Sequence, residues 1–102
     1  MGHYFCLAGF CVDAEQCLLS STDKDLPSVL LILSATLVRN LESFPQKEDA
    51  ALHLRMQGLV DCMTRRMLFS AQTLEIFEAA HVFRRAIDNA CVRVWSDARG
   101  LL

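Results

Sequence analysis

One stretch of the sequence constrains the fold more than any other, because its apolar residues recur at alternating steps of four and three. The positions are Ile76, Ala80, Phe83, Ile87, Ala90 and Val94. Residues spaced in this way lie on one side of an α-helix, so the pattern predicts a long helix with a continuous apolar seam. The seam has to be buried, either against helices of the same chain or in a coiled coil with another chain.

Two further helices are predicted before this one. Apolar residues at steps of three and four between positions 52 and 67 indicate an amphipathic helix that opens in the sequence QKED after Pro45. Gly58 within it either costs helix stability or lets another helix approach closely. Between Pro27 and Pro45 the chain is apolar nearly all round, as in a helix at the centre of a bundle. A buried strand over 29–38 is the alternative, but the length of the run favours a helix.

The N-terminal part of the chain is less defined. Asp13 is a suitable N-cap for a short helix that runs through Leu19. The aromatic stretch from His3 to Phe10 can form a strand, an extended arm or the start of a helix. The polar residues 20–25 predict a loop.

The boundary between the last two helices decides how the seam is buried. Ser70 or Thr73 can cap a separate last helix, which would fold back as a hairpin. No Gly or Pro lies between Gly58 and Gly100, however, so one helix of some fifty residues is the alternative, and it would require a second chain. The fold predicted for residues 1–102 is a single all-α domain, an up-down bundle of three to four helices, with an extended N-terminal arm left open.

Composition indicates that some apolar surface remains for an interface. Hydrophobic residues make up 53% of the 102 residues, and a domain of this size has little interior. The first fifty residues carry a net charge of −4, whereas the remainder carries +2 and all its basic residues are arginine. Arginine suits carboxylate pairing, so the two halves are expected to meet within one subunit or between two. A solvated surface of mixed charge is the simpler alternative.

These features predict a non-catalytic protein–protein interaction module rather than an enzyme. We expect a homodimer that acts as an adaptor, a chaperone, or an inhibitor or regulator of a larger assembly. The predicted partner-binding residues flank the seam of the last helix and include the residue types that most often carry binding energy: Phe77, Arg84, Arg85, Cys91 and Trp95. The sequence assigns no residue to catalysis, a cofactor or a metal.

A DNA-binding regulator is the first alternative function. The pairs Arg65–Arg66 and Arg84–Arg85, together with Arg93 and Arg99, are its candidate contacts. Acidic residues share the same helices and the net charge of the chain is −2, so nucleic acid is not the expected partner. The alternative requires these arginines to converge on one face.

A metal or thiol redox sensor is the second alternative. His3, Cys6, Cys11 and Cys17 are suitable zinc ligands by type, but their spacing is not that of a structural zinc site. The five cysteines are expected to be reduced and buried in a cytoplasmic protein, since no signal-peptide pattern opens the sequence. Cysteine catalysis would need Cys62 to meet His53 or His81 outside any recognisable motif. The longest apolar run, between positions 29 and 38, is too short to span a bilayer.

Overall fold

The computed structural model describes residues 5–44 and 50–99, with the main chain alone for 95–99. These residues form four α-helices: α1 (Leu7–Ser20), α2 (Leu26–Arg39), α3 (Ala50–Leu68) and α4 (Leu74–Arg99). A short 3-10 helix, η1 (Leu41–Ser43), follows α2. No strand occurs in these two stretches. The predicted all-α bundle is therefore confirmed, with four helices.

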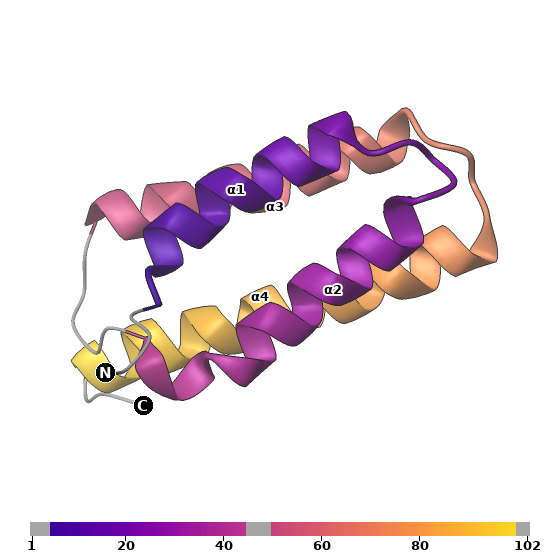
Figure 1. Cartoon of the computed structure of the whole chain (residues 1–102). Helices are drawn as coiled ribbons and strands as arrows, with labels where there is room; N and C mark the ends of the chain where they lie inside the picture. Colours follow the sequence, from indigo (N-terminus) through magenta and orange to yellow (C-terminus); the bar gives the residue numbers. More distant parts are fainter. Residues whose placement is uncertain (1–4, 45–49, 100–102) are drawn as a thin grey trace.

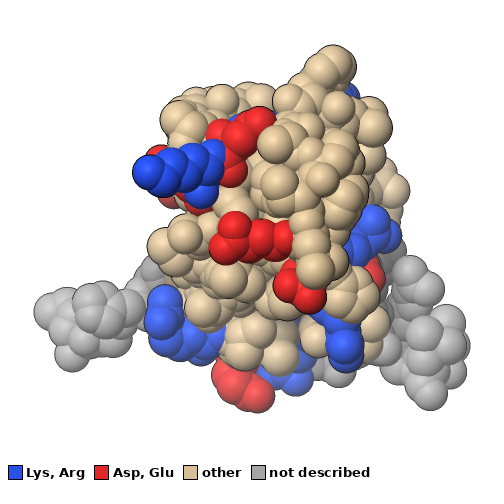
Figure 2. Space-filling model, turned by 90° about the vertical axis from the view of Figure 1, so that its right-hand side faces the viewer, with Lys and Arg blue, Asp and Glu red and all other residues tan. Residues whose placement is uncertain are grey.

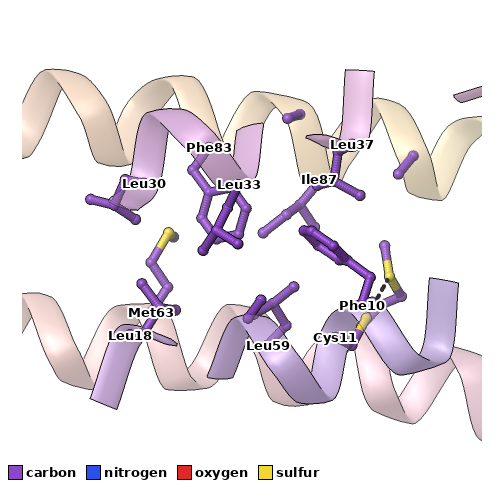
Figure 3. Close-up of a cluster of buried hydrophobic side chains, with 14 of the residues drawn as sticks. Phe10, Cys11, Leu18, Leu30, Leu33, Leu37, Leu59, Met63, Phe83 and Ile87 are labelled. Atoms are coloured by element: carbon purple, nitrogen blue, oxygen red, sulfur yellow. Dashed lines mark hydrogen bonds between the residues drawn. The ribbon is translucent and has the colours of Figure 1, made fainter. Parts of the chain in front are cut away.

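Successive helices run in opposite directions and form two layers (Figure 1). α1 lies beside α3 in one layer and α2 lies beside α4 in the other, so the closest neighbours are parallel. The core fills the space between the layers (Figure 3), where Phe83 and Ile87 of α4 lie with Leu33 of α2 and face Leu18 and Leu59 of the other layer. Each helix therefore occupies one corner of the bundle and buries one of its faces.

The chain folds back between α3 and α4, which settles how the seam is buried. α3 ends at Leu68, and the Thr73 side chain caps α4 by accepting a hydrogen bond from the Ile76 N–H at 3.2 Å. One unbroken helix is therefore wrong and the hairpin is confirmed. All six residues of the seam, from Ile76 to Val94, are buried within the subunit. The seam needs no second chain.

Asp13 is not the N-cap of α1 but lies within the helix, which begins at Leu7, so the start of a helix is the correct alternative for residues 7–10. Cys6 is its N-cap: the backbone there is extended, and the Cys6 Sγ accepts a hydrogen bond from the Gly9 N–H at 3.4 Å. Residues 7–10 are therefore helical, and a strand or extended arm is wrong for them. The sulfur of cysteine is a weak acceptor, so the residue does not stand out as a cap in the sequence. His3 and the rest of residues 1–4 lie outside the described part.

α2 ends at Arg39, before the predicted stop at Pro45. Asn40 follows it, and its Nδ2 donates a hydrogen bond to the Thr36 carbonyl at 2.8 Å, which satisfies one of the carbonyls at the helix end. η1 then turns the chain so that Phe44 is buried, with the ring of Phe5 stacked on it at a centroid distance of 5.6 Å. The predicted helix start in QKED falls on residues 46–49, outside the described part.

α2 is also not the central helix that its composition predicts. It contacts α4 closely and α1 less closely, and its buried face consists of Leu26, Pro27, Leu30, Leu33, Ser34 and Leu37. Ser34 is the one polar member, and its hydroxyl donates to the Leu30 carbonyl at 2.7 Å. The opposite face of α2 is exposed, because a bundle of four helices at four corners surrounds none of them.

Arg66 joins two turns at one end of the bundle. Its Nε donates to the Leu18 carbonyl at 3.0 Å, and its Nη2 donates to the Ser21 carbonyl at 3.0 Å and to the Asp23 carboxylate at 2.8 Å. The other carboxylate oxygen of Asp23 accepts from the Ala71 N–H at 2.8 Å. The guanidinium thus satisfies carbonyls at the end of α1 and, through Asp23, fixes residues 21–25 to the turn between α3 and α4.

Ion pairs join the acidic half of the chain to the basic half. They lie within one subunit, which is one of the two arrangements expected from the charge asymmetry. Arg66 pairs with Asp23 at 2.8 Å, and Arg93 of α4 pairs with Glu42 of η1 at 3.7 Å. The hydrogen bonds from Arg66 and from the Ala71 N–H hold the pKa of the Asp23 carboxyl below its usual value. The asymmetry of charge thus contributes to tertiary structure.

We expect Arg66→Ala to lower the free energy of unfolding by about 2 kcal/mol, because it leaves main-chain carbonyls without their charged donor. Arg66→Lys should restore less than half of the loss, since the donors of an ammonium all lie on one nitrogen and cannot take the place of both Nε and Nη2. Arg65→Ala is the control, because Arg65 is exposed, and it should change stability by less than about 0.5 kcal/mol. Urea unfolding followed by circular dichroism measures all three, and equal effects of the two alanine variants would contradict this role.

Gly58 faces α1 but is not required there. A Cβ at this position would lie 3.4 Å from the Glu15 Oε2, which is an ordinary contact with the end of a flexible side chain. We therefore expect Gly58→Ala to raise the free energy of unfolding by about 0.5–1 kcal/mol, because alanine is the better helix former. Thermal unfolding checks this, and a lower melting temperature would show that the α1–α3 contact needs glycine.

Candidate interaction site

A groove of about 410 Å³ lies between α3 and α4, where the two layers meet. Its lining includes apolar side chains from both helices, Met56, Val60 and Ile87, and polar ones, among them Gln57, Asp61, Arg84 and Asp88. The Arg84 Nε donates to the Asp88 carboxylate at 3.1 Å. The groove therefore has a mixed lining in which one arginine and one carboxylate already pair.

The structure brings together only part of the predicted partner-binding set. Arg84 and Cys91 both line the groove. Phe77 lies one helical turn from the start of α4 and is 48% exposed, while Arg85 is exposed and is not part of the groove lining. The side chain of Trp95 lies outside the described part. Phe77, Arg84 and Cys91 follow one another at steps of seven residues along α4, so these three lie on one row, and Arg85 lies off that row.

Three of the arginines considered for DNA binding have partners within the subunit. Arg66 is bonded to the end of α1, Arg84 pairs with Asp88 in the groove, and Arg93 pairs with Glu42 of η1. These contacts lie at different places around the bundle, and each compensates the positive charge with a carboxylate or carbonyl. Arg65 and Arg85, the other described members of the set, are exposed.

The cysteines are distributed between the core and the surface. Cys11 is fully buried, and its Sγ donates to the Met56 Sδ at 3.5 Å (Figure 3), whereas Cys6 and Cys17 are exposed. Cys62 is buried and donates to the Glu15 carbonyl at 3.9 Å, and Cys91 is half-buried. The prediction that all five are buried is wrong for Cys6 and Cys17. The described residues include no group of three or more His, Cys, Asp and Glu that could hold a metal ion.

Burial keeps the inward-facing thiols protonated. It raises the pKa of Cys11 to about 12, with the nearby Glu15 carboxylate as a smaller cause, and it raises the pKa of Cys62 and Cys91. A thiol is nucleophilic as the thiolate, so these three are poor nucleophiles near neutral pH.

We therefore expect iodoacetamide at pH 8 to alkylate Cys6 and Cys17 first in the folded protein. Cys11 and Cys62 should react at least about a hundredfold more slowly, because opening of the core limits their modification. Peptide mass spectrometry over a time course measures the five sites separately. Rapid labelling of Cys11 under native conditions would contradict the packing of α1 on α3.

Exposed apolar side chains gather at two places. The first is the end of the bundle around the α3–α4 turn, where Leu68, Phe69, Leu74 and Phe77 are exposed, Phe69 by 84%. Figure 2 looks onto this end and shows a broad uncharged area with Asp and Glu side chains and, toward its margins, Lys and Arg side chains. Glu75 and Glu78 belong to the first turns of α4 at the same end. This end patch is therefore apolar surface interspersed with acidic groups.

The second place is the outer face of α2, defined here as Ser28, Leu31, Ile32, Ala35 and Val38. All five are exposed, with 47% of Leu31, 65% of Ile32 and 62% of Val38 accessible. No charged residue occurs from Leu26 to Val38, so this face has no polar stripe toward solvent. The sequence prediction placed the interface on the last helix and did not single out this face. The signal was an apolar helix without any polar side.

Comparisons with known proteins found no match. No protein-family model matches it, and neither a curated protein nor a solved structure is significantly similar. None of the described helices is both long enough and apolar enough to cross a membrane.

Proposed function

We propose that this chain is a non-catalytic protein-interaction module that forms a homodimer through the outer face of α2. The observation that carries the proposal is the exposed apolar face itself, which has no charged residue over thirteen consecutive positions, 26–38. A helix on the surface of a monomer normally turns charged or polar residues to water. A contiguous exposed apolar face is typical of a surface that binds another protein.

A second copy of the same chain suits this face. Two such faces can pack together without burying a charge, so neither copy suffers the desolvation penalty that an unpaired charge would cause. At 100° per residue, Ser28 and Ala35 lie along the centre of the face, while Leu31 and Val38 lie on one side of it and Ile32 on the other. Small residues in the centre let two helices approach closely, and the larger aliphatic side chains flank the contact.

Two features support the non-catalytic part of the proposal. Burial keeps the thiols of Cys11, Cys62 and Cys91 protonated, and the groove between α3 and α4 holds an arginine already paired with Asp88. A dimer formed through α2 would leave this groove and the end patch accessible. Both remain available to a larger partner, which is compatible with a role as an adaptor, a chaperone or a regulator.

The proposal predicts that Ile32→Glu converts a concentration-dependent dimer into a monomer, because two glutamates would face one another in an apolar contact. Leu54→Glu is the matched control: Leu54 is an exposed aliphatic residue on α3, 67% accessible against 65% for Ile32. Sedimentation equilibrium over a wide concentration range, with a reducing agent present, gives the dissociation constant of each variant. The control should dimerise like the unmodified protein.

Two results would overturn the proposal. An unmodified protein that stays monomeric at high concentration has no dimer to explain. A dimer that survives Ile32→Glu unchanged, but is lost on substitution of Phe69 by Ser, would move the interface to the end patch. Circular dichroism of each variant confirms that the monomer remains folded.

A further inference from the structure

We infer that the two copies pair with their α2 helices antiparallel, so that Asp25 of each copy lies beside Arg39 of the other. This inference rests on the proposed dimer and adds its direction, its centre and its polar contacts. It comes from the two charged residues that bound the apolar face and from their positions around the helix.

A charge of opposite sign stands at each end of the outer face. Asp25 is the N-cap of α2 and Arg39 is its last residue, and both side chains are exposed. The Asp25 Oδ2 accepts a hydrogen bond from the Thr22 Oγ1 at 3.1 Å, which holds the carboxylate at the start of the helix. At 1.5 Å per residue, the Cα atoms of Asp25 and Arg39 are about 21 Å apart along the helix.

These two residues also lie on the same edge of the face. Asp25, Ile32 and Arg39 follow one another at steps of seven residues, and an α-helix drifts by only about 20° per seven residues. The three positions therefore form one row along α2. Ile32, in the exposed apolar face, is the midpoint of that row.

Two-fold symmetry distinguishes the possible pairings. An axis perpendicular to the helices and passing near Ile32 reverses one α2 relative to the other but keeps the row on the same side of the contact. Asp25 then meets Arg39 of the second copy at both ends, and the two Ile32 side chains lie together at the centre. A parallel pairing, about an axis along the helices, would instead put the two rows on opposite sides of the contact with like charges at the same level, so no Asp25–Arg39 pair could form. The antiparallel pairing also opposes the two helix dipoles.

Charge reversal tests the direction of pairing. Asp25→Arg or Arg39→Asp alone replaces two attractive contacts by two repulsive ones, and we expect each to weaken the dimer by roughly five- to tenfold at low salt. The double variant Asp25→Arg with Arg39→Asp should restore the affinity, because the pairs re-form with exchanged signs. Asp25 makes no side-chain capping bond within α2, so its replacement does not remove a helix cap. In a parallel dimer the single reversals would leave the affinity unchanged.

Cysteine cross-linking gives an independent readout. Because Cys6 and Cys17 are exposed, both are first replaced by serine, and this background is the control. Asp25→Cys mixed with Arg39→Cys should form a disulfide-linked heterodimer on mild oxidation, whereas neither variant alone should cross-link efficiently. A dimer that cross-links through two copies of Arg39→Cys, and is insensitive to charge reversal, would overturn the antiparallel geometry while leaving the proposed function intact. The absence of any dimer would overturn the proposed function itself.

Discussion

The fold depends on the tight connection between α3 and α4, which Arg66 and Asp23 fix against the end of α1. With the chain turned back at this point, α4 lies along α2 and its apolar seam is buried inside the subunit. A continuous helix over the same residues would have exposed that seam and required a second chain to cover it. The bundle instead completes its own core, so an interface has to use surface that the core leaves over.

The outer face of α2 is the part of that surface with the fewest polar groups. Each helix occupies a corner of the bundle and buries one side, and for α1, α3 and α4 the opposite side includes charged residues. α2 differs because it has no charge between Asp25 and Arg39. In the proposed dimer, the same two residues that end the apolar stretch would give the pair its direction. Composition, bundle geometry and the ends of one helix all support the proposed interface.

The sequence was sufficient to predict the fold class and the buried faces of α3 and α4, because helical periodicity is a local signal. It did not reveal the role of Arg66, whose partners Leu18 and Asp23 are more than forty residues away along the chain. Arg66 instead resembled a nucleic-acid contact, since a pair of adjacent arginines looks the same in either role. The sequence left the conformation of residues 3–10 open and placed the cap at Asp13 instead of Cys6, because a thiol is an unusual cap.

The proposed interaction site was harder to predict than the fold. An apolar helix is normally a buried one, and only the position of α2 at a corner shows that Leu31, Ile32 and Val38 face outward. The predicted residues on α4 were chosen because their angular position on the helix is next to the seam. This position agrees with Arg84 and Cys91 lining the groove, but it does not show that α3 of the same chain forms the other side of the groove.

The most direct test of the account is a dilution series followed by two-dimensional ¹⁵N–¹H NMR of the unmodified protein. The account predicts that the concentration-dependent shifts are confined to the amides of α2 and its two ends, near Asp25 and Arg39, while the amides along the seam of α4 stay unchanged. Shifts that map to the seam or to the end patch around Phe69 would contradict it, because the self-association would then use a surface other than α2.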